Sequence, residues 1–264
     1  MSAIQAIDWY DTPRYYDLVF DEETSVEVAF LEWVATTYGR GLAKAKRRVL
    51  EPACGSGRLM VALAKEGWRV TGTDLSQPML DYAAERLRSA DLRGKLLNAD
   101  MAAPQPKGQY DLAHCLVSTF KYLQTERDAR AHLRHVADSL APGGVYVLGF
   151  HLTDYARTGY ERERWVVDRD GIRVVCNIQS WPPDRESRTE RMRSRLVVTE
   201  HGETRRTETN WTFRTYDADQ VRSLLKAVPA LEHVATYDFN YDPGARGELA
   251  DDGFDTILIL RKHD

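Results

Sequence analysis

The 264-residue sequence predicts an α/β fold in which a mainly parallel, doubly wound sheet is interrupted late in the chain by an antiparallel β insertion. Two patterns predict this fold. Between residues 49 and 150, short apolar runs alternate with segments of helical apolar spacing, which is typical of parallel strands joined by right-handed crossovers. Between residues 165 and 216, strand-like runs follow one another with turn residues between them and no helical period, which indicates an antiparallel meander.

The N-terminal part predicts helical structure. In 22–38, apolar residues recur at four-residue steps from Val26 to Tyr38, which indicates an amphipathic helix. Five large aromatic residues precede this helix. That is more aromatic surface than a solvated tail would carry, and we expect residues 1–46 to form a helical lid over a ligand. The aromatic residues are Trp9, Tyr10, Tyr15, Tyr16 and Phe20.

The next hundred residues contain the alternating elements. Ser76 is expected to cap a helix, because its hydroxyl can accept a hydrogen bond from an amide of the first turn. The sequence Ala-Pro-Gly-Gly after Leu140 is expected to end another helix. The predicted strands are 49–51, 68–74, a short one within 95–100, 110–120 and 145–150, and the predicted helices are 58–66, 76–90 and 126–140.

After His151 the pattern changes. We expect an antiparallel insertion over 155–216, with core segments 47–154 and 217–264 on either side of it. Its predicted strands are 164–170, 171–181, 193–200 and 209–216, followed by a helix at 217–228 and two pairing strands at 232–242 and 254–262.

Composition limits the possible partners and surroundings. The net charge of −4 gives no general attraction to nucleic acid or to an anionic membrane. The arginines of the insertion are largely matched by acids, so a solvated sheet face explains them best. Three widely spaced cysteines suggest neither a disulfide framework nor a metal site. With no signal-like or membrane-spanning stretch, we expect a cytoplasmic monomer or homodimer that has no metal and no nucleic-acid or membrane partner.

A glycine loop joins the strand at 49–51 to the next helix. Such a loop lets the backbone approach a ligand closely. A dinucleotide site would need GxGxxG, but Met60 stands at the third glycine position, and a phosphate loop would need GxxxxGK followed by Ser or Thr. Acids at Glu51 and Asp74 instead suit a ligand that offers an ammonium group and vicinal ribose hydroxyls, as S-adenosylmethionine does.

Five motifs in order make the chain resemble the class I S-adenosylmethionine-dependent methyltransferases, and the small-molecule N-methyltransferases among them in particular. The motifs are VLEPACGSGRL, VTGTDLS, NADM, YDLAHCLVSTFKYL and LAPGGVYVLGF. The resemblance covers about 47–150 closely and the C-terminal part more loosely. It implies a Rossmann-like sheet of seven strands whose last strand is antiparallel, and it implies S-adenosylmethionine as cofactor with S-adenosylhomocysteine as product.

The resemblance also implies cofactor-binding residues. Glu51, Ala53, Gly55 and Gly57 would line the methionine end, and Asp74 would take the ribose hydroxyls. The other implied positions are Leu75 and Met101 beside the adenine, Asp100 at its amino group, Leu116 near the sulfonium and Tyr16 against the cofactor.

Methyl transfer from a sulfonium requires mainly alignment and exclusion of water, so few side chains need to act chemically. Tyr10, Tyr122 and His151 are the candidates for taking a proton from an amine acceptor or orienting it. In the similar amino-sugar enzymes a histidine tends to stand where this chain has Tyr122. The preferred hypothesis is methyl transfer to a small molecule, most simply an amine. The alternatives are an O-methyltransferase, a macromolecule methyltransferase and a non-catalytic cofactor-binding protein.

Overall fold

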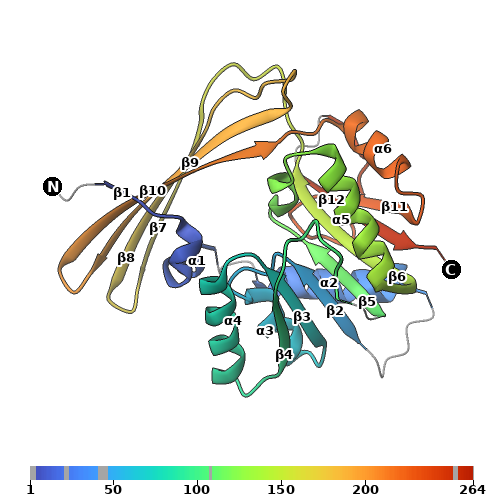
Figure 1. Cartoon of the computed structure of the whole chain (residues 1–264), viewed down its shortest axis with the longest axis horizontal. Helices are drawn as coiled ribbons and strands as arrows, with labels where there is room; N and C mark the ends of the chain where they lie inside the picture. Colours follow the sequence, from blue (N-terminus) through green and yellow to red (C-terminus); the bar gives the residue numbers. More distant parts are fainter. Residues whose placement is uncertain (1–3, 21–23, 41–46, 107–108, 252–254, 264) are drawn as a thin grey trace.

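The computed structural model describes residues 4–20, 24–40, 47–106, 109–251 and 255–263. A seven-stranded sheet forms the centre, with strand order β11-β12-β6-β5-β2-β3-β4 (Figure 1). The pairs among β2 to β6 are all parallel, whereas β12 is antiparallel to both β6 and β11. The strands are β2 (Arg48–Pro52), β3 (Arg69–Asp74), β4 (Gly94–Asn98), β5 (Tyr110–Cys115), β6 (Leu140–His151), β11 (Leu231–Tyr237) and β12 (Asp255–Lys262).

Helices cover both faces of this sheet and create two hydrophobic cores. One core lies under α2 (Thr24–Tyr38), α3 (Arg58–Lys65) and α4 (Gln77–Ser89). The other lies under α5 (Glu126–Ser139) and α6 (Ala218–Lys226). Strand residues alternate between the two, as Leu112 and Ala113 of β5 do, because successive side chains of a strand point to opposite faces. This arrangement confirms the doubly wound fold.

The insertion forms a second sheet, of five strands in the order β1-β10-β9-β8-β7. Four antiparallel strands come from the insertion itself, and left-handed turn residues connect them at Asp170-Gly171 and His201-Gly202, as the turn signals predict. The fifth strand, β1 (Ile4–Ala6), pairs parallel with β10. The others are β7 (Glu161–Arg169), β8 (Ile172–Ser180), β9 (Thr189–Glu200) and β10 (Glu203–Arg214).

The N-terminal segment packs on the inner face of the insertion sheet. It consists of β1, the short 3-10 helix η1 (Trp9–Asp11) and α1 (Pro13–Phe20). Trp9 and Val19 are buried against apolar side chains of β8 and β9, which makes a third, smaller core. Figure 1 shows α1 between the insertion sheet and the central sheet. The helix α2, by contrast, belongs to the core of the central sheet.

Some element boundaries differ from the sequence predictions. Residues 141–144 lie within β6 and do not form a separate turn, because Tyr110 already pairs with Leu140 before a register shift. The strand β1 was not predicted, since its hydrogen bonds depend on a partner far away in the sequence. The predicted starts at Glu22 and Phe254 lie outside the described residues. In the part of the chain that the structure describes, no helix is both long and apolar enough to cross a membrane.

Candidate functional site

The loop after β2 has an unusual backbone. Ala53, Gly55 and Gly57 all have positive φ, at 55°, 52° and 70°. A Cβ on Gly55 would meet no atom within 4 Å, so the space beside this residue is open. The loop therefore presents a bare backbone to whatever lies above the carboxyl end of the sheet, which is where open α/β sheets bind ligands.

Two other glycines serve packing. A Cβ on Gly57 would lie 2.7 Å from the Cβ of Ala83, so this glycine allows α3 and α4 to approach each other. A Cβ on Gly72 would lie 2.3 Å from the sulfur of Met60. Met60 thus occupies space that Gly72 of the neighbouring strand leaves free, which explains how the loop accommodates a large residue where dinucleotide sites have a small one.

Asp74 ends β3 beside this loop. One carboxylate oxygen accepts a 2.8 Å hydrogen bond from the amide of Gly55, and the other accepts one of 2.8 Å from the amide of Ser76. Ser76 caps α4 as predicted, because its hydroxyl accepts from the amide of Met79. Each carboxylate oxygen has a second lone pair, so Asp74 is held in place with capacity for two further hydrogen bonds.

Glu51 lies below the loop and is 9% exposed. Its Oε2 is buried without a hydrogen-bond partner among the described residues, and its Oε1 lies 3.9 Å from Nδ1 of the buried His114. Burial raises the pKa of Glu51 well above its usual range, and burial lowers the pKa of His114 to about 3, so the imidazole stays neutral. An orphaned carboxylate oxygen of this kind fits the ammonium group of an amino-acid ligand.

A cavity of about 880 Å³ opens above these residues. It is bounded by the loop after β2, the ends of β3 and β4, the N-terminal segment, and η2 (Thr119–Tyr122) with the residues that follow it. Nine of the predicted site residues line it: Tyr10, Tyr16, Ala53, Gly55, Asp74, Leu75, Asp100, Met101 and Tyr122. Leu75 is 65% exposed there, although it is a large apolar residue, which suits a position that a ring of the ligand would cover.

The phenols of Tyr10 and Tyr122 meet at the edge of this cavity. Tyr10 donates a 2.8 Å hydrogen bond to Tyr122. Burial raises the pKa values of both phenols, and it raises the pKa of Tyr16 to about 12. All three phenols therefore keep their protons at neutral pH, and as hydrogen-bond donors they suit orientation of a ligand better than removal of a proton from it.

The four remaining predicted residues do not line this cavity. Glu51 lies under the loop, and Gly57 stands where the loop meets α3 and packs against Ala83. The side chain of Leu116 packs in the core beneath Gly149. His151, at the end of β6, lines a second cavity on the other side of η2.

Two features of the site have no clear signal in the sequence. Asp17 of α1 accepts a 2.8 Å hydrogen bond from Ser56 in the glycine loop and pairs with Arg86 of α4, so it holds the N-terminal segment against the core. Val117, two residues after the end of β5, has a φ of 55° and is 51% exposed. Strained backbone at a β-branched residue is uncommon and concentrates at functional sites.

The comparisons with known proteins agree with this geometry. A family model described as a methyltransferase domain matches residues 49–144. The chain is 30% identical over 154 residues to the dTDP-4-amino-2,3,4,6-tetradeoxy-D-glucose N,N-dimethyltransferase of Saccharopolyspora spinosa, which covers 58% of each chain. It is 28% identical over 145 residues to a protein of Geobacillus sp. (strain WCH70) that is named as a methyltransferase, covering 55% of this chain and 56% of that one. The chain thus spans little more than half the length of these two relatives.

A solved structure extends the likeness to nearly the whole chain. An S-adenosylmethionine-dependent methyltransferase from Clostridium acetobutylicum ATCC 824 superposes with a TM-score of 0.78 at 19% identity, over 97% of this chain and 99% of that one. At this identity the match concerns the fold, and it includes the insertion as well as the central sheet.

Proposed function

We propose that this chain, with its match to a methyltransferase domain over residues 49–144, is a class I S-adenosylmethionine-dependent methyltransferase and transfers a methyl group from S-adenosylmethionine to an amine of a small molecule. The observation that carries the proposal is the pairing of Asp74, anchored by two backbone amides, with the orphaned oxygen of Glu51 at one glycine loop. Together they match two polar parts of this cofactor, namely the ribose hydroxyls and the ammonium group.

Other residues that line the cavity would position the rest of the cofactor in this proposal. Leu75 and Met101 would enclose the adenine, and Asp100 would accept from its amino group. Asp100 Oδ1 already accepts a 2.7 Å hydrogen bond from the amide of Ala102, which fixes the carboxylate at the rim of the cavity. When bound, S-adenosylmethionine supplies an electrophilic methyl group on a sulfonium. The task left to the protein is to orient the acceptor, keep water out and accept a proton.

A small acceptor is supported by the way the site is covered. Tyr10 and Tyr16 of the N-terminal segment line the cofactor cavity, and Trp9 of the same segment is buried against the insertion. Trp9 donates from its backbone amide to Thr209 of β10 at 3.0 Å, so segment and insertion form one cover over the carboxyl end of the sheet. A folded macromolecule has little access beneath such a cover. An amine is supported by the dimethyltransferase of S. spinosa, whose name describes a 4-amino sugar.

Calorimetric titration with S-adenosylmethionine, S-adenosylhomocysteine, NAD and NADP tests the cofactor. We expect the first two to bind and the nucleotides not to bind. A screen with methyl-labelled cofactor then tests the acceptor, using amines, matched alcohols, protein and RNA. Transfer to protein or RNA, or transfer to alcohols in preference to amines, would contradict the proposal.

A further inference from the structure

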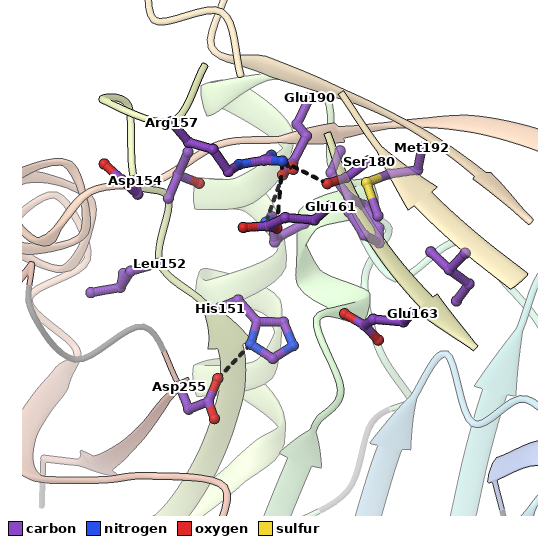
Figure 2. A pocket seen from close by; sticks show the side chains of 14 residues that line it. His151, Leu152, Asp154, Arg157, Glu161, Glu163, Ser180, Glu190, Met192 and Asp255 are labelled. Carbon is purple, nitrogen blue, oxygen red and sulfur yellow. Dashed lines mark hydrogen bonds and ion pairs between the residues drawn. The ribbon is translucent and has the colours of Figure 1, made fainter. Parts of the chain in front are cut away.

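A second cavity, of about 480 Å³, lies between the carboxyl end of β6 and the inner face of the insertion sheet (Figure 2). The sheet register brings its wall residues together. Glu163 of β7 pairs with Ile178 of β8, and Glu190 of β9 pairs with Phe213 of β10. Since cross-strand partners point to the same face, these four side chains project towards the cavity from four different strands.

The cavity adjoins the cofactor cavity across a thin wall. Lys121 lines the second cavity and Tyr122, the next residue, lines the first. The ring of Phe213 belongs to the second cavity and meets the ring of Tyr122 edge-on, with centroids 4.9 Å apart. A ligand in the second cavity would therefore lie beside the methyl donor, and methyl transfer requires the rings of Tyr122 and Phe213 to turn aside so that the acceptor nitrogen reaches the methyl carbon.

The charged groups of this cavity are unbalanced. Five carboxylates line it, against the two cations Lys121 and Arg157. Both cations contact Glu190: Lys121 lies 3.5 Å from it, and Arg157 forms an ion pair with it as well as one of 3.4 Å with Glu161. The remaining carboxylates belong to Asp154, Glu163 and Asp255.

Glu163 is the carboxylate left without a partner. Among the residues that the structure describes, its side chain has neither a hydrogen bond nor an ion pair, and Figure 2 shows it beside His151 at the cavity. Glu163 keeps contact with solvent, but partial removal from water raises its pKa, and the neighbouring Glu161 and Asp255 raise it further, while His151 opposes them. Such a carboxylate gains most from a ligand that is itself positively charged.

His151 is held by Asp255. Nδ1 of the imidazole lies 2.8 Å from the Asp255 carboxylate, and the two residues face each other directly in the β6–β12 register. When Nδ1 carries the proton that this hydrogen bond needs, Nε2 has a free lone pair. The pair therefore supplies a proton acceptor at the cavity on a ring whose orientation is fixed.

We propose that the second cavity binds the methyl acceptor as an ammonium ion, with Glu163 as its counter-charge and Nε2 of His151 as the acceptor of its proton. This inference rests on the proposed function. The N–H bond of the ammonium breaks and an Nε2–H bond forms, which leaves a neutral amine with the lone pair that methylation requires. Asp255 acts as a positioning residue, because it stabilises the imidazolium that results. The substrate class is thus a cationic amine with an apolar body, which Phe213 and Ile178 contact.

Direct binding tests this inference without turnover. The full chain, saturated with S-adenosylhomocysteine, is titrated at pH 7 with cyclohexylammonium and, separately, with cyclohexanol, its neutral counterpart of similar shape. We expect the wild type to prefer the cation by about two- to fivefold, as for a pair between partly solvated charges, and we expect E163Q to lose the preference. E186Q is the matched control, because it removes an exposed carboxylate of the same insertion outside the cavity and should keep the preference.

No preference in the wild type, or a preference that survives E163Q, would overturn the inference. The titration with S-adenosylhomocysteine reports on the proposed function separately, so a protein that binds the product but ignores the charge of the probe refutes the acceptor site alone. For an acceptor found in the screen, D255N should lower kcat several-fold and move its pH profile, while KM stays within about twofold. An unchanged pH profile would exclude the positioning role.

Discussion

The Tyr10 and Tyr122 phenol oxygens lie 2.8 Å apart and join the N-terminal segment to the loop that follows β5. Because both phenols stay protonated, we predict that Tyr10→Phe and Tyr122→Phe leave the pH profile of transfer unchanged between about pH 6 and 9 and lower kcat less than tenfold. Each should lower the free energy of unfolding by about 0.5–1.5 kcal/mol, the value of one hydrogen bond. Tyr160→Phe, at an exposed tyrosine, is the control. If the rate of transfer by either variant no longer fell at low or at high pH as it does in the wild type, the phenol would titrate during catalysis.

Asp74 should dominate the affinity for the ribose. Asp74→Ala removes a charged acceptor and should weaken binding of S-adenosylhomocysteine by roughly 2–4 kcal/mol in calorimetry, since a hydrogen bond to a charged group is worth about 1.5–3 kcal/mol. Asp81→Ala removes an exposed carboxylate on the neighbouring α4 and should leave the affinity as it is. Equal affinities in the two variants would refute the role of Asp74.

Glu51 should stabilise the bound cofactor and destabilise the free protein. Its pKa is raised in the folded state, so the folded protein binds the proton more tightly than the unfolded chain does. This carboxyl group therefore favours folding at pH values below the unfolded value near 4.5, and that contribution is lost as the pH rises through the folded pKa. Glu51→Gln should unfold at higher denaturant concentration than the wild type at pH 8, and the difference should shrink at pH 4.

The same variant should bind S-adenosylhomocysteine more weakly, by about 1.5–3 kcal/mol, because it lacks the charge that pairs with the ammonium group. A variant that is both less stable at pH 8 and unimpaired in binding would contradict both expectations.

The close approach of α3 and α4 depends on Gly57. Gly57→Ala adds a methyl group 2.7 Å from Ala83 and places an alanine at a φ of 70°, whereas Gly67→Ala meets no atom within 4 Å at a φ of 85°. Both variants should lose about 1–2 kcal/mol from backbone strain, and Gly57→Ala should lose about 1–3 kcal/mol more from overpacking. Denaturant unfolding measures the difference. Similar denaturation midpoints for the two variants would mean that α3 and α4 can move apart with little loss of stability.

The N-terminal segment should gain order when the cofactor cavity is filled. Tyr10 and Tyr16 line that cavity, so a ligand adds contacts to a segment that Asp17 already links to the core. We predict slower amide exchange in 9–20 when S-adenosylhomocysteine is added, measured by hydrogen–deuterium exchange with α5 as internal reference. Protection that is the same with and without ligand would identify the segment as a fixed anchor and exclude the lid.

The cofactor side of the site could be predicted from the sequence because its signals are local. Gly55 follows β2 and Asp74 ends β3, and parallel strands that are neighbours bring their carboxyl ends together. Once β2 and β3 are identified, their parallel pairing predicts that the two residues lie close together, and the structure adds the hydrogen bond between them. The same logic places Asp100 and Met101 after β4, at the next position along that edge.

On the acceptor side, His151 is a candidate from the sequence because it follows a predicted strand, but its neighbours Glu163 and Asp255 could not be predicted in this way, because their placement depends on register. Glu163, His151 and Asp255 come from β7, β6 and β12, and a shift of one residue in any of these strands would turn the side chain to the other face. The near-balanced charge of the whole insertion also hides the acidic lining of this cavity, because the acids that line it are counted together with arginines on the opposite face of the sheet. The placement of Leu116 in the core reflects the same limit, because the sequence does not show to which side a residue turns as a strand ends.

The hydrogen bond from Trp9 to Thr209 spans 200 residues, and this has a consequence for synthesis on the ribosome. At a translation rate of about 5–20 residues per second, Trp9 leaves the ribosome on the order of ten to forty seconds before its partner strand does. During that time Trp9, Tyr16 and Phe20 have no insertion sheet to cover them. The nascent chain therefore carries an uncovered aromatic, apolar segment over residues 9–20 while the central sheet is still being made. Such a segment is a ready target for chaperones, and its burial is among the last steps of folding.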